Sequence, residues 1–155
     1  MYLFSLYIHV ITAIIWIGGQ LFLPLVLIPA LKKIECDNPI KRSIVIETGI
    51  VFSKVGKWLM LIFVLTGIGN FYFKFHSFQI EIFQSRYGEL LLLKVTLFLI
   101  MLAINFYHEI KVGLRMKEYL NNEEYERIRK IASITGRITL LLSLIIAFIG
   151  LYITK

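Results

Sequence analysis

The chain has 155 residues, 58% of them hydrophobic, and a mean hydropathy of +0.78. This composition is too apolar for a soluble domain of this length and is typical of a polytopic membrane protein. The formal net charge of +7 does not indicate a nucleic-acid partner, because nearly all basic residues fall in two loops, where they act as topology signals. The single cysteine, Cys36, excludes an internal disulfide and is not by itself a metal site.

The first predicted membrane span covers about residues 2–31. Its core, HVITAIIWIGGQLFLPLVLIP, begins at His9, and no formal charge follows until Lys32. About 20 apolar residues at a rise of 1.5 Å per residue cross the roughly 30 Å hydrocarbon core of a bilayer. The run is too long for the apolar region of a signal peptide. We therefore expect lipid to be the solvent of this chain.

Three further apolar runs predict spans over about residues 56–73, 89–110 and 135–154. Continuous apolar runs favour helices over the alternating strands of a membrane β-barrel. The sequence thus predicts one domain, an all-α, antiparallel four-helix transmembrane bundle. Asp37-Asn38-Pro39 indicates a turn, after which the chain is expected to follow the membrane surface before the second span. A helix start near Asn122, capped by Asn121, predicts a cytoplasmic helical hairpin between the last two spans.

The basic residues predict the orientation. The first and third loops carry thirteen Lys and Arg residues and the second carries two: Lys32, Lys33, Lys41, Arg42, Lys54, Lys57, Lys111, Arg115, Lys117, Arg127, Arg129, Lys130 and Arg137, against Lys74 and Arg86. By the positive-inside rule the first and third loops are cytoplasmic. The protein is therefore expected in the plasma (inner) membrane, with both termini outside.

Ionisable groups in or near the spans are the candidates for function, because such groups are costly in lipid and tend to face the bundle interior. They are His9, Lys94 and His108, with His76 just outside the spans. On the third span, Lys94, Met101, Asn105 and His108 share one helical stripe, and on the first, His9 and Trp16 are seven residues apart and share a face. Both stripes are expected to face the other helices.

Depth separates these candidates. His9 and Lys94 are expected at a similar level near the outer leaflet, whereas His108 lies about 20 Å from Lys94 along the helix. His9 and His108 are therefore not expected to bind one metal ion, whereas His9 with Lys94 or His76 is geometrically allowed. Imidazole in a bundle is a usual axial ligand of haem iron. The structural alternatives are an interior hydrogen bond for His9, an amine that reaches the outer interface for Lys94, and a helix-end role for His108.

Several segments resemble the copper-resistance protein D (CopD) family. They are His9-Val10, Trp16-Ile17-Gly18-Gly19 and Pro29 in the first helix, Phe52-Ser53-Lys54-Val55 leading to Thr66-Gly67 in the second, and Lys94 with a late His108 in the third. The same helices are also similar to HemJ-type protoporphyrinogen oxidases, small four-helix-core membrane proteins that bind haem b. The second resemblance implies that His9 and Lys94 are the important pair. The first implies copper handling or a membrane redox role.

Three functions follow as hypotheses. The first is a small membrane redox protein with haem b near the outer leaflet, held by His9, with Lys94 or His76 as second ligand or propionate partner and Trp16 packed near the ring. The second is a copper-handling protein in which His9, Met101 and His108 mark a path. The third is a structural or assembly subunit. Whether the protein is an enzyme stays undecided; an enzyme would be a membrane oxidoreductase. The expected partners are the lipid bilayer and a membrane or periplasmic redox protein, and a homo-oligomer stays open.

Overall fold

The computed structural model describes residues 1–35, 37–75, 85–113 and 122–153. Within these ranges all regular secondary structure is helical, which confirms the predicted fold class. The elements are α1 (Tyr2–Phe22), η1 (Leu23–Leu27), α2 (Ile28–Lys33), α3 (Asn38–Phe75), α5 (Arg86–His108), η2 (Glu109–Gly113) and α6 (Asn122–Ile153). Here η1 and η2 are short π-helical turns that continue α1 and α5.

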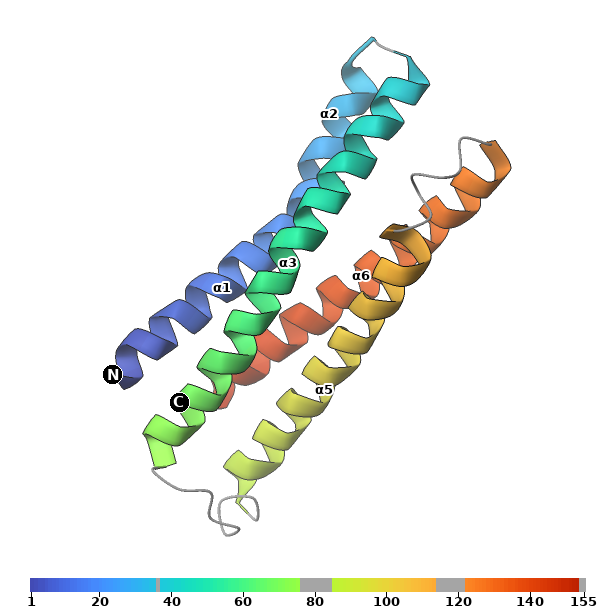
Figure 1. Ribbon diagram of the computed structural model, residues 1–155. Helices are drawn as coiled ribbons and strands as arrows, with labels where there is room; N and C mark the ends of the chain where they lie inside the picture. Colours follow the sequence, from blue (N-terminus) through green and yellow to red (C-terminus); the bar gives the residue numbers. More distant parts are fainter. Residues whose placement is uncertain (36, 76–84, 114–121, 154–155) are drawn as a thin grey trace.

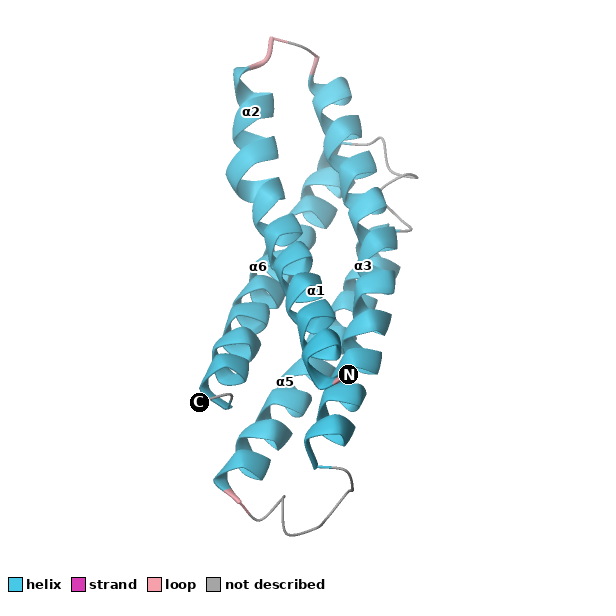
Figure 2. Ribbon diagram, turned by 90° about the vertical axis from the view of Figure 1, so that its left-hand side faces the viewer, coloured by secondary structure: helices cyan, strands magenta, loops and turns pink. Residues whose placement is uncertain are grey.

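The helices form two hairpins, one in which α1 packs along α3 and one in which α5 packs along α6. Figures 1 and 2 show the two hairpins lying against each other, with the N-terminus and the end of α6 toward the same end of the bundle as the last turn of α3. Contacts between α1 and α6 join the hairpins. A second link is the edge contact between the rings of Phe63 on α3 and Phe98 on α5, whose centroids are 6.1 Å apart.

Four helices are long and apolar enough to cross a membrane: Tyr2–Lys33, Asn38–Phe75, Arg86–Val112 and Glu123–Ile153. Their outward faces carry large apolar side chains, such as Phe4, Trp58 and Phe148, which are 72%, 69% and 71% exposed. Apolar surface of this extent is not found on water-soluble monomers. The protein is therefore a multi-pass membrane protein.

The second helix differs from its prediction. Instead of a surface segment followed by a span, α3 is one continuous helix from Asn38 to Phe75. Pro39 stands in the first helical turn, where its missing N–H is not needed, and the carbonyl of Asp37 accepts from the amides of Ile40 and Lys41. A helix of 38 residues is about 57 Å long, so α3 extends well beyond the hydrocarbon core. The predicted start of the last helix near Asn122 is confirmed, whereas the Asn121 cap lies outside the described residues.

The first helix changes its hydrogen-bond pattern at η1. Pro24 and Pro29 stand in and just after this turn, and each removes one backbone donor. The amide of Ile28 donates to the carbonyl of Leu23, five residues earlier, which is the π-helical pattern. The turn lets one span continue through two prolines without a break.

The centre of the bundle is built around Trp16. Its indole Nε1–H donates to the hydroxyl of Ser143 on α6 at 3.0 Å. The same hydroxyl lies 2.8 Å from the Thr139 carbonyl and 3.2 Å from the sulfur of Met101 on α5. On α3, Phe52 stacks on the indole with ring centroids 5.5 Å apart. Trp16 therefore ties the two hairpins together.

Candidate functional site

His9 is anchored to α3 by one ring nitrogen. Its Nδ1 lies 2.8 Å from Oγ1 of Thr66. The single hydroxyl proton of Thr66 is directed at the carbonyl of Ile62, at 2.6 Å, so the Thr66 oxygen accepts and His9 Nδ1–H donates. In a neutral His9 this bond leaves the lone pair on Nε2. The ring of Phe63 meets the imidazole edge-on, with centroids 5.0 Å apart.

This arrangement is the one that metal-binding histidines use. In such sites one ring nitrogen donates to a protein oxygen, which fixes the tautomer and aims the other nitrogen at the ligand. Gly67, next in the chain after Thr66, keeps the neighbouring position small: a Cβ there would lie 3.9 Å from Cε1 of His9. The interior hydrogen bond expected under the structural alternative is therefore present, and it leaves Nε2 free of that bond.

Lys94 lies partly buried on α5. Lys94 is directed from α5 toward α6, where the absence of a side chain at Gly150 makes room for it: a Cβ at that glycine would lie 3.3 Å from Nζ of Lys94. That Lys94 and His9 meet at one depth stays a prediction.

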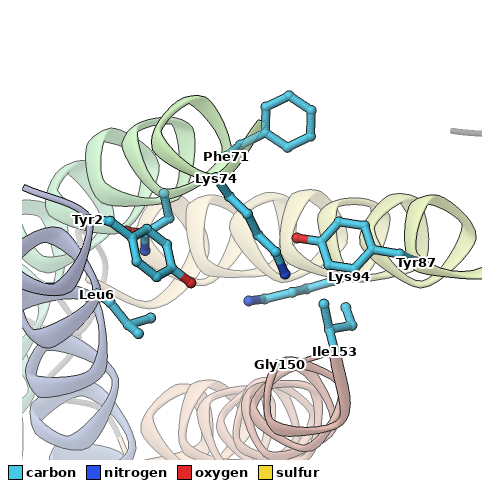
Figure 3. A pocket seen from close by; sticks show the side chains of 9 residues that line it. Tyr2, Leu6, Phe71, Lys74, Tyr87, Lys94, Gly150 and Ile153 are labelled. Atoms are coloured by element: carbon cyan, nitrogen blue, oxygen red, sulfur yellow. The ribbon is translucent and has the colours of Figure 1, made fainter. Parts of the chain in front are cut away.

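A cavity of about 80 Å³ opens beside Lys94. We call it the termini-end cavity, because it lies where α1 begins and α6 ends. Nine residues line it: Tyr2, Leu6, Asn70, Phe71, Lys74, Tyr87, Lys94, Gly150 and Ile153. Figure 3 shows the amine ends of Lys74 and Lys94 and the hydroxyl of Tyr2 directed into the same space. In the sequence, Lys74 counts only as a basic residue of the second loop, and no pattern distinguishes Tyr2 or Tyr87.

Trp16 lies in the central cluster rather than beside the termini-end cavity. One face of its ring is stacked by Phe52, and the ring also lies against Gly56, where a Cβ would approach within 2.8 Å of Cζ3. Protein atoms therefore already occupy these two sides of the indole. Its predicted packing against a cofactor ring stays a prediction.

Of the remaining predicted site residues, the structure describes His108. His108 ends α5 and is half-buried, about four turns beyond Lys94 on the helix that carries Met101 between them. The next residue, Glu109, forms an ion pair with Lys57 of α3. His76 lies outside the described residues. Within the described part of the chain, no three His, Cys, Asp or Glu side chains gather closely enough to hold a metal ion.

Haem b does not fit the cavity at Lys94. Pockets for organic ligands usually measure about 300–1,000 Å³, against about 80 Å³ here, and His9 is not among the lining residues. A larger surface hollow of about 430 Å³ is lined by Lys54, Lys57, Trp58 and Leu61 and includes no histidine. Neither space is both large enough for the haem macrocycle and lined by His9. The haem hypothesis is therefore not supported.

These features define a class of protein: a multi-pass membrane bundle of four helices with an anchored histidine and a buried lysine in its interior. The family model for copper resistance protein D (CopD) matches residues 46–152. The chain therefore belongs to the copper-resistance protein D family, which confirms the first resemblance; the similarity to HemJ-type oxidases stays a prediction.

The sequence similarity to one relative extends over nearly the whole chain. The sequence is 31% identical over 150 residues to a protein of Aquifex aeolicus (strain VF5) described as uncharacterized, and the match covers 96% of this chain and 92% of that protein. No solved structure matches the chain. The functional comparison therefore depends on the membership in the copper-resistance protein D family. That membership agrees with the copper hypothesis better than with the haem hypothesis.

Proposed function

We propose that this protein handles copper in the membrane and that Nε2 of His9 is the first ligand for the ion. The observation that carries this proposal is the hydrogen bond from Nδ1 of His9 to Thr66. This bond fixes the imidazole so that the lone pair of Nε2 can bind a metal ion inside a bundle of the copper-resistance protein D family. Imidazole nitrogen is a suitable ligand for copper. A binding histidine held by a protein oxygen keeps its orientation while the ion arrives and leaves.

Lys94 supplies the second nitrogen near His9. As an ammonium it repels a copper ion by charge, and as a free amine it offers a lone pair. Loading of the ion at His9 is then coupled to release of a proton from Lys94, in the way that metal binding generally displaces protons from its ligands. Cu(I) tolerates few ligands, so a pair of nitrogens is a sufficient transient site.

A path for the ion along α5 agrees with the polar stripe of that helix. Met101, which is 2% exposed, presents its thioether between the levels of Lys94 and His108, and soft sulfur is a preferred ligand of Cu(I). Asn105, one turn further, bonds its amide to the Met101 carbonyl at 3.0 Å. We propose that copper passes from the His9 level toward His108, with both termini outside the inner membrane as the distribution of basic residues predicts.

A competition titration tests the proposal. Purified protein in detergent is titrated anaerobically with Cu(I) against a chromogenic chelator. We expect one high-affinity site, which His9→Ala removes and Thr66→Val weakens about 10- to 100-fold, the usual cost of losing the oxygen that holds a metal-binding histidine. Thr48→Val is the matched control, because the Thr48 hydroxyl makes the same bond to its own helix, to the Ile44 carbonyl at 2.7 Å.

Two results would contradict the proposal. One is Cu(I) affinity that is unchanged by His9→Ala. The other is an absorption spectrum of the protein purified from membranes with a Soret band that His9→Ala abolishes, which would restore the haem redox hypothesis. A preparation that binds neither copper nor haem would favour the hypothesis of a structural or assembly subunit.

A further inference from the structure

The termini-end cavity has the side chains of an oxyanion site. Two of its lining residues, Lys74 and Lys94, are cations, and none of the described residues that line it is acidic. We propose that this cavity binds the phosphate group of an anionic phospholipid. Lys94 also enters the copper proposal, so the test below is made on Lys74, which does not; the proposed first copper ligand, His9, does not line the cavity.

The two amines reach the cavity from different hairpins. Lys74 stands near the end of α3, and its Nζ lies 4.3 Å from the ring centroid of Tyr87 on α5 and 5.7 Å from that of Phe75. The aromatic faces hold the amine over the cavity mouth by cation–π attraction. Lys94 forms the floor, where a partly buried cation gains from a nearby negative charge. Figure 3 shows the two nitrogens converging.

The cavity also offers neutral hydrogen-bonding groups. The phenol hydroxyls of Tyr2 and Tyr87 are donors that suit phosphate oxygens. The buried amide oxygen of Asn70 has no hydrogen-bond partner within the described part of the chain. Buried polar atoms usually have a hydrogen-bond partner. A ligand that donates a hydrogen bond to this oxygen would supply the missing partner. The hydroxylated headgroup of phosphatidylglycerol carries both a phosphate and such donors.

Size and position favour a lipid over a soluble anion. About 80 Å³ has room for several waters or one tetrahedral oxyanion, but not for a whole lipid. The acyl chains would lie outside, against exposed apolar side chains at the same end of the bundle such as Leu3 and Tyr152, which are 63% and 60% exposed. Tyrosine and lysine at helix ends are the residues expected at the level of the headgroups.

Native mass spectrometry of the full chain in detergent tests this site. The probes are phosphatidylglycerol, phosphatidylcholine and inorganic phosphate, each titrated separately. We expect phosphatidylglycerol to bind at least about tenfold more tightly than phosphatidylcholine, and Lys74→Met to weaken it about fivefold, the effect of one basic residue near an anionic membrane surface. Lys130→Met, an exposed lysine of α6 far along the chain from the cavity, is the matched control and should leave binding unchanged.

A second variant separates the site from general charge. Tyr87→Phe keeps the ring under Lys74 but removes the hydroxyl, and it should weaken phosphatidylglycerol binding without altering the net charge. Equal affinity for the two lipids, or equal losses in Lys74→Met and Lys130→Met, would overturn the proposal. Displacement of the lipid by millimolar inorganic phosphate would overturn the lipid assignment in favour of a soluble oxyanion. Unchanged Cu(I) affinity in Lys74→Met alongside weakened lipid binding would support the site and show that it is separate from the copper proposal.

Discussion

The contact between Trp16 and Gly56 can be tested by adding one methyl group. A Cβ at Gly56 would lie 2.8 Å from Cζ3 of Trp16, which is closer than carbon atoms pack. The indole cannot easily move away, because Ser143 holds its Nε1 at 3.0 Å and Phe52 stacks on the ring. Overpacking of this kind costs about 1–3 kcal/mol. Gly56→Ala should therefore lower the free energy of unfolding despite the better helix propensity of alanine.

Gly18→Ala on α1 is the matched control. A Cβ at Gly18 has no other atom within 4 Å, so this variant gains the helix propensity of alanine, about 0.5–1 kcal/mol, without a clash. Because that gain is common to both variants, the difference between them isolates the Trp16 contact and should be about 1–3 kcal/mol. Reversible unfolding in mixed micelles with increasing SDS, followed by far-UV circular dichroism, measures it. Equal stability of the two variants would refute the packing of Trp16 against Gly56.

Three further outcomes are expected. Glu109→Gln removes the ion pair with Lys57, which is partly exposed, and should cost less than about 1 kcal/mol in the same unfolding assay; a larger loss would assign this pair a structural role. Cu(I) affinity should fall as the pH is lowered in the chelator competition, because protons compete with the ion for nitrogen ligands; a profile that stays flat down to acidic pH would contradict ligation by nitrogen. A periplasm-specific reporter fused after Lys155 should be active, and activity of a cytoplasm-specific one would reverse the proposed orientation.

Most of the fold follows from hydropathy. Four apolar runs and the turn at Asp37-Asn38-Pro39 were sufficient to predict four helices, and the stripes on the first and third spans predict the inward faces of those two helices. The continuous helix through residues 38–75 could not be predicted, since its first half is polar enough to lie on a surface and Gly49 and Gly56 mark places where a helix could end. The π-helical turn at Leu23–Leu27 depends on how the chain accommodates Pro24 and Pro29, which a hydropathy pattern does not describe.

The candidate site was predicted in part. Spacing predicts that His9 and Lys94 face inward, because the rotation of a helix per residue is constant, and both side chains are partly buried; their common depth stays a prediction. The partner of His9 was missed. Thr66 comes from another helix, and the register between two helices depends on packing details such as the gap at Gly67. The same limit applies to Lys74, whose role depends on the ring of Tyr87 standing beneath it.

Gly150 shows that small residues can recur regularly along a helix for different physical reasons. Gly136, Ser143 and Gly150 recur every seven residues on α6, as in a seam of small residues that lets helices approach. Yet a Cβ at Gly136 would meet no atom within 4 Å, whereas one at Gly150 would lie 3.3 Å from the amine of Lys94, and Ser143 is a hydrogen-bond partner of Trp16. The small residues thus serve separate needs along the helix. At Gly150 the small residue leaves space for a lysine, and without that space the amine of Lys94 could not lie between α5 and α6.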